Sequence, residues 1–86
     1  MTDAEIRSTV LRALKRIAPE ANLDELGGKE DVHDALDIDS MDFNTFVLAL
    51  HDALHVDIAE KDYPRFFTLD GCVAELGARL KNTGTS

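Results

Sequence analysis

Apolar residues recur at intervals of three and four in three separate stretches of this 86-residue chain. Such spacing is typical of helices that bury one face, and no stretch shows the sustained alternation of a strand. Thr2 and Glu5 match a capping box at the start of the first stretch, and Pro19 ends it. A helix is therefore predicted over residues 3–18. Its core face comprises Ile6, Val10, Ala13, Leu14 and Ile17.

The second and third stretches predict two more helices. One should begin at Asp39 or Ser40, since both residue types are good N-caps. Its buried stripe comprises Met41, Phe43, Phe46, Val47, Leu48, Leu50 and Leu54. Thr68 can cap a last helix, which two glycines weaken, so that packing must hold it. Its core face comprises Leu69, Cys72, Val73, Leu76 and Leu80.

Two segments link these helices. Residues 19–39 are predicted to form a long loop whose large aliphatic side chains pin it to the core. Those side chains are Leu23, Leu26, Val32, Leu36 and Ile38. Residues 60–67 leave room for one or two helical turns, and Pro64 is expected to hold Tyr63 in an extended conformation. The tail, residues 82–86, is expected to fray.

Together these elements predict an all-α fold, a small up-down bundle of three main helices plus one short helix, in a single domain spanning residues 1–86. The single cysteine, Cys72, excludes an internal disulfide and a zinc-binding cysteine cluster. No stretch approaches the roughly 20 apolar residues that span a bilayer, and the acidic first residues are unlike a secretory or mitochondrial leader. We therefore expect a cytoplasmic protein that does not insert into membranes.

The acidic residues are concentrated in the central third of the chain. The sequence has 17 acidic and nine basic residues, for a net charge of −8. Nine of the acids lie between Glu30 and Glu60, where no Lys or Arg occurs. Such a field disfavours binding to nucleic acid and attracts partners with basic surfaces.

The stretch LDIDSMDF, residues 36–43, lies within this acidic region and suggests several kinds of site. As a calcium loop beginning at Asp37 it lacks the turn glycine and two of the required ligands. His51 and His55 share a helix face, but two ligands do not make a zinc site. Ser40 as a catalytic nucleophile would need a positioned base, and His51 lies three turns further along the same helix. The residues thus predict neither a metal site nor an enzyme, and a plain helix cap stays open.

The four residues Asp39-Ser40-Met41-Asp42 resemble the D-S-[LM]-[DE] attachment motif of acyl carrier proteins. The resemblance covers about residues 3–81, because the order of long helix, long loop, motif, helix, short helix and final helix is also similar. It implies that Ser40 carries a 4′-phosphopantetheine arm, transferred from coenzyme A by a separate phosphopantetheinyl transferase. The thiol of the arm would hold acyl groups as thioesters.

The resemblance also implies partners and contact residues. The partners would be acyl-loading and acyl-transfer or condensing enzymes with basic surfaces, visited by a monomeric carrier. Partner-contact candidates are Asp39, Met41, Asp42, Phe43, Asp52 and Asp57. In this family the acyl chain can lie between the helices, and the corresponding side chains could equally be ordinary core. They are Phe46, Leu50, Ile58, Phe66, Phe67, Leu69 and Val73.

Two departures from the family pattern suggest a specialised carrier. Carriers of fatty acid synthesis usually have glycine where this chain has Asp37, and they tend to carry several glutamates along the second helix, where this chain has none. Peptidyl carriers usually show G-[GH]-[HD]-S, which the residues before Ser40 do not match. We therefore expect a role in a dedicated lipid or secondary-metabolite pathway. The alternative is an unmodified acidic helical adaptor or inhibitor.

Overall fold

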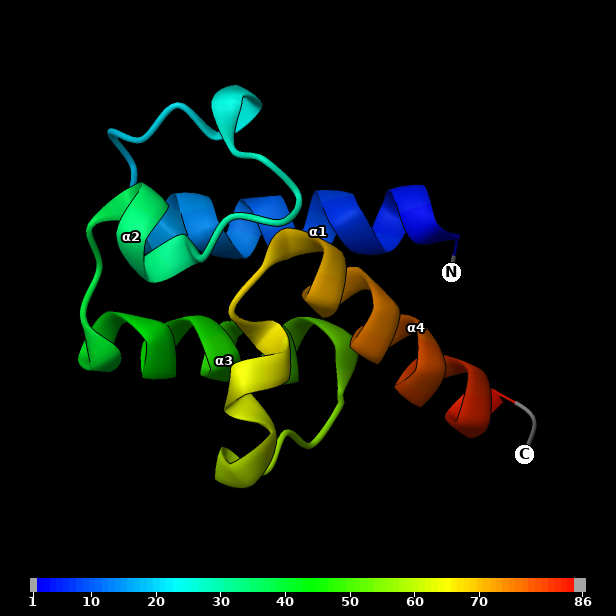
Figure 1. Ribbon diagram of the computed structural model, residues 1–86. Coiled ribbons are helices and arrows are strands. Elements are labelled where there is room, and N and C mark those ends of the chain that lie inside the picture. The colour runs from blue at the N-terminus through cyan, green and yellow to red at the C-terminus, as the bar shows by residue number, and fades with distance from the viewer. Residues whose placement is uncertain (1, 85–86) are drawn as a thin grey trace.

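The computed structural model describes residues 2–84, with side chains described through residue 80, and in this range it contains helices and no strands (Figure 1). The elements in chain order are α1 (Asp3–Ile17), η1 (Leu23–Glu25), α2 (Val32–Leu36), α3 (Ser40–Leu54), η2 (Glu60–Phe66) and α4 (Leu69–Gly84). Helices α1 and α3 run in opposite directions and α4 crosses them obliquely (Figure 1). The predicted all-α bundle of three main helices and a short one is confirmed.

Helix α1 begins with the predicted capping box. The Thr2 hydroxyl accepts a hydrogen bond from the Glu5 backbone N–H at 3.2 Å, and the Glu5 carboxylate accepts one from the Thr2 N–H at 3.0 Å. The bond from the Thr2 backbone lowers the pKa of Glu5, since it favours the charged carboxylate. Behind this cap Ile6, Val10 and Leu14 are fully buried.

The segment between α1 and α3 is more ordered than the sequence indicates, because it contains η1 and α2. Asn22 caps η1, and Asp31 caps α2 by accepting from the His33 N–H at 2.8 Å. Val32, which opens α2, is fully buried, and its N–H donates to the Phe67 carbonyl at 2.8 Å. The prediction that aliphatic side chains pin this segment is confirmed, whereas the prediction of a loop throughout is wrong. Tertiary contacts, rather than local periodicity, hold so short a helix.

Two further predictions, both in the C-terminal half of the chain, are wrong. Tyr63 lies within the 3₁₀ helix η2 and is not extended, since the fixed φ of Pro64, near −65°, is compatible with 3₁₀ geometry. Helix α4 continues through Gly84, so residues 82–84 are helical where a frayed tail was expected; residues 85–86 lie outside the described range.

The core lies where α1, α3, η2 and α4 meet. Its largest fully buried side chains are Phe46, Phe66, Ile6, Leu14, Leu50, Leu69 and Leu76. Gly71 allows the close approach of η2 to α4, because a Cβ at this position would collide with the Arg65 carbonyl oxygen. A Cβ at Gly77 would meet only ordinary contacts, 3.9 Å from Asp3 and Ile6.

This difference predicts opposite effects of alanine at the two glycines of α4. Gly77→Ala should stabilise the fold by up to about 1 kcal/mol, the difference in helix propensity. Gly71→Ala should destabilise it by roughly 1–3 kcal/mol through overpacking against backbone. Urea unfolding followed by circular dichroism measures both. Equal stabilisation by the two variants would contradict the close approach at Gly71.

Candidate functional site

Ser40 is the first residue of α3, and its side chain is exposed. The residue that caps the helix is Asp39, whose carboxylate accepts from the Asp42 N–H at 2.9 Å. Asp42 completes a capping box with a longer bond of 3.5 Å from the Asp39 N–H. The cap therefore does not use the Ser40 hydroxyl, which stands at the helix start with no hydrogen-bond partner among the described residues.

Three residues, 37–39, connect the end of α2 to the start of α3. Asp37 has a left-handed conformation, with φ 52° and ψ 49°, and its N–H donates to the His33 carbonyl. Glycine adopts this conformation freely, whereas Asp and Asn are among the few other residues that tolerate it. Asp37 thus has the backbone geometry that a glycine would favour, and it adds a negative charge. Ile38 is buried beside it.

The expected partner-contact residues divide into exposed and buried ones. Asp39, Asp52 and Asp57 are exposed, Met41 is 79% exposed and Asp42 is partly buried. Met41 therefore does not belong to the buried stripe predicted for α3. Leu48 does not belong there either, because it is 55% exposed.

Phe43 is only 2% exposed, which confirms its place in the predicted buried stripe and does not suit the partner contact that was also expected of it. Its ring lies 4.9 Å from His33, 5.6 Å from Phe46, 5.6 Å from Tyr63 and 5.2 Å from Phe67, measured between ring centroids. We call these five side chains the aromatic cluster. Its members come from α2, α3, η2 and the residue that follows η2, so Phe43 joins segments that are distant in sequence.

The expected acyl-pocket residues form closely packed core. Four of them are 0% exposed: Phe46, Leu50, Phe66 and Leu69. The others, Ile58, Phe67 and Val73, are partly buried and pack against this core. Ile58 lines an open surface depression of about 390 Å³ beside Leu48, His51 and Tyr63.

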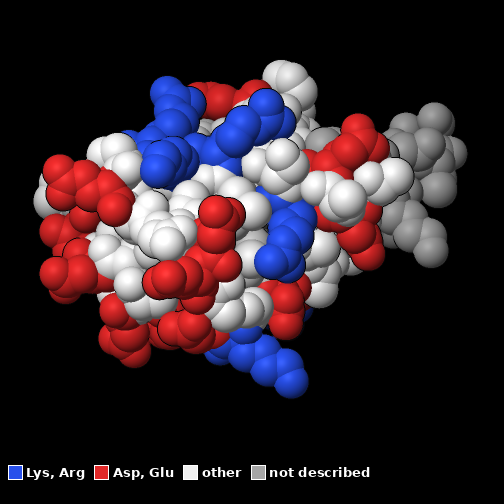
Figure 2. Space-filling view, turned by 90° about the horizontal axis from the view of Figure 1, so that it is seen from above, with Lys and Arg blue, Asp and Glu red and all other residues white. Residues whose placement is uncertain are grey.

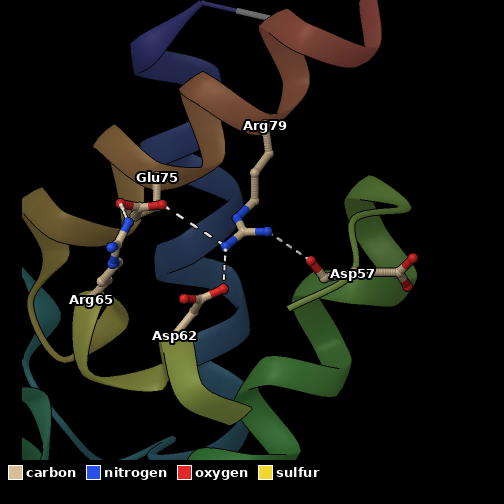
Figure 3. A network of polar contacts seen from close by, with 5 residues as sticks. All are labelled: Asp57, Asp62, Arg65, Glu75 and Arg79. Atoms are coloured by element: carbon tan, nitrogen blue, oxygen red, sulfur yellow. Dashed lines mark hydrogen bonds and ion pairs between the residues drawn. The ribbon is translucent and has the colours of Figure 1, made fainter. Parts of the chain in front are cut away.

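A polar network holds η2 and the preceding loop against α4 (Figure 3). Arg79 of α4 contacts the Asp62 carboxylate at 3.1 Å and donates to the Asp57 carbonyl at 3.0 Å. Glu75 accepts from Arg65 at 3.2 Å and lies 3.9 Å from Arg79. The side chains of Asp62, Glu75 and Arg79 are only 22–27% exposed, so their mutual attraction is less screened than that of a surface pair. The Arg79 guanidinium also lies over the Phe66 ring, 5.7 Å from its centroid.

The charged side chains are unevenly distributed over the surface. Helix α1 presents exposed Arg7, Arg12, Lys15 and Arg16 and has no acid after Glu5. In Figure 2, several Lys and Arg side chains gather toward the upper edge, others lie near the centre and at the lower edge, and Asp and Glu side chains cover much of the left and lower parts. The charged residues nearest to Ser40 in sequence are all acidic: Asp37, Asp39 and Asp42.

The histidines at the end of α3 have structural partners. The Nδ1 atom of His51 lies 2.8 Å from the Val56 carbonyl oxygen and 3.4 Å from the Asp57 carboxylate. His55 ends the helix in a left-handed conformation, with φ 55°. Across residues 2–84 no three His, Cys, Asp or Glu side chains are placed to hold a metal ion.

No protein-family model matches the chain, and no curated protein sequence matches it significantly. Within the described residues, no helix combines the length and the apolar character needed to cross a membrane.

Separate roles for the charge and the cap of Asp39 can be tested by substitution. Asp39→Ala should lower the free energy of unfolding by about 1 kcal/mol, because it leaves the Asp42 N–H without its acceptor. Asp39→Asn should retain most of that stability, since asparagine caps helices comparably. Chemical unfolding of both variants measures the difference. An asparagine variant as unstable as the alanine variant would show that the cap geometry is not what stabilises α3.

Cys72 should be unreactive in the folded protein. It is fully buried, its Sγ lies 3.2 Å from the Phe66 carbonyl oxygen, and burial raises the pKa of the thiol to about 12. Because the thiolate is the nucleophile, Ellman's reagent at pH 8 should react with one thiol in denatured protein and with none over the same minutes in native protein. The reactive fraction should grow only as the pH approaches the raised pKa. Rapid reaction of the native protein would contradict this burial.

Proposed function

We propose that this protein is an acyl carrier, with a 4′-phosphopantetheine arm attached to the hydroxyl of Ser40. The observation that best supports this is the state of Ser40 itself. It is exposed at the first position of a 15-residue helix, it is flanked by the residues of the resembled motif, and its hydroxyl is left out of the cap. A side chain that another enzyme must modify needs such accessibility and needs no catalytic base of its own.

The start of α3 suits the phosphodiester that attachment would create. The cap satisfies the Asp42 N–H, and the Phe43 N–H donates to the Asp39 carbonyl at 3.0 Å. The N–H groups of Ser40 and Met41 precede the first intrahelical bond, so they and the helix dipole can stabilise an anion there. Asp39 and Asp42 have their carboxylates turned to backbone donors within the cap. Their charge would oppose the phosphodiester if it came close, and it would attract a basic protein surface.

The bound arm would supply a thiol that forms thioesters, and the chain itself would present and orient that arm without catalysing a reaction. Its partners would be a phosphopantetheinyl transferase and enzymes that load, transfer or condense acyl groups. Exposed Met41 and Leu48 lie on α3 among exposed Asp39 and Asp52, which suits a partner surface with apolar contacts and surrounding cations. We further propose that the carrier is monomeric and cytoplasmic. Because α3 has no glutamate, unlike the corresponding helix of carriers of fatty acid synthesis, we propose that it serves a dedicated lipid or secondary-metabolite pathway.

The second candidate function is an unmodified acidic adaptor or inhibitor. The acidic surroundings of Ser40 favour it, because they would attract a basic protein with or without an arm. In that case Ser40 would have no chemical role.

Incubation with coenzyme A and a broad-specificity phosphopantetheinyl transferase distinguishes the two candidates. Intact-mass spectrometry should show that the wild-type protein gains one phosphopantetheine group. Ser40→Ala should gain none, and Ser8→Ala, which removes another exposed serine on α1, should gain one as the wild type does. An unmodified wild type, under conditions in which a reference carrier is fully modified, would favour the adaptor.

A further inference from the structure

We propose that this protein keeps its cargo outside the helical core and therefore carries short acyl groups rather than long alkyl chains. This rests on the proposed attachment at Ser40, because a chain linked there must pass between α3 and its neighbours to reach the core. The aromatic cluster fills that passage.

The side chain that closes the passage is Phe43, less than one helical turn beyond Ser40. Its ring stacks on His33 of α2 and meets Tyr63 of η2 and Phe67 edge-on. These contacts place the Phe43 ring against α2 on one side and against η2 on another. With Phe43 only 2% exposed, a long chain would have to displace rings that are already packed.

The surrounding segments are tied together by hydrogen bonds, so the rings cannot separate independently. The Tyr63 hydroxyl donates to the Asn44 side chain at 3.1 Å, which joins η2 to α3. The Val32 N–H donates to the Phe67 carbonyl, which joins α2 to the residue that follows η2. On the far side of η2, the ion pair of Asp62 with Arg79 opposes movement away from α4.

Beyond the aromatic cluster the core side chains are fully buried. Leu50, Phe66 and Leu69 are 0% exposed, as is Phe46 within the cluster. Inserting methylene groups into a close-packed interior forces side chains and backbone to shift. A short acyl group avoids this cost, because it can remain with the arm at the surface. Phe43 is thus the specificity-determining residue.

A chain-length series on the wild-type protein tests this directly. The phosphopantetheinyl transferase joins acetyl-, butanoyl- or octanoyl-phosphopantetheine from the corresponding acyl coenzyme A to the Ser40 oxygen and releases adenosine 3′,5′-bisphosphate. Intact mass verifies each product. Thermal unfolding should give the same midpoint for the three forms to within about 1 °C, since a chain outside the core buries no additional area. Cleavage of the three thioesters by hydroxylamine should proceed at similar rates.

Removal of the closing ring should reverse this behaviour. In Phe43→Ala the apolar cavity can receive a chain, so octanoyl should raise the unfolding midpoint above that of the acetyl form. It should also slow hydroxylamine cleavage by about tenfold, as expected when the chain is inside most of the time. Thr45→Ala is the matched control, because it truncates an exposed side chain two residues further along α3. That variant should behave like the wild type.

The possible results distinguish failure of the proposed function from failure of the short-chain inference. Failure of the mass measurement to show any arm on Ser40 overturns the proposed function, and the short-chain inference with it. If the arm is present and octanoyl stabilises the wild type or protects its thioester, the short-chain inference alone is overturned. The wild-type series gives this answer even if Phe43→Ala does not fold. A folded Phe43→Ala that shows no chain-length effect overturns the role of Phe43.

Discussion

The arrangement of α2 and η2 depends on their contacts with the buried ring of Phe43. Its ring touches α2, η2 and the residue after η2, none of which has enough internal hydrogen bonds to be stable alone. Because these segments are positioned by packing, the side chain that they share fixes their distance from α3. The same contact closes the interior near Ser40, so one residue links the stability of the fold to the range of cargo that we propose.

The start of α3 shows how an exposed hydroxyl is kept available at a well-ordered position. Asp37 reverses the chain in a left-handed conformation, and Asp39 then caps the helix. An exposed serine at a helix start would itself be a good cap, and its hydroxyl would then be engaged. Because Asp39 caps the helix, Ser40 occupies the first helical position and its hydroxyl makes no cap hydrogen bond. The cap and the proposed attachment are therefore complementary roles of adjacent residues.

Much of the fold could be predicted because its long helices have strong local signals, including the capping box at Thr2 and the apolar period of α1. The sequence could not show which apolar residues of α3 face inward, since that stripe is broad and its orientation depends on the neighbours. Met41 and Leu48 are exposed although the predicted stripe includes them, whereas Phe43 is buried as the stripe predicts. Helix α2 could not be predicted, because five residues carry no readable period. Apolar side chains at Phe46 and Leu50 could be recognised as internal, but only their packing shows whether space remains between them.

Tandem mass spectrometry of the protein isolated from its own cells tests the central claim most directly. We expect the peptide that contains Ser40 to carry phosphopantetheine, and fragmentation to release the arm together with its acyl group. The mass of that group also reveals the natural cargo. The claim would be contradicted if the isolated protein had an unmodified Ser40 while other carriers from the same cells bore their arms.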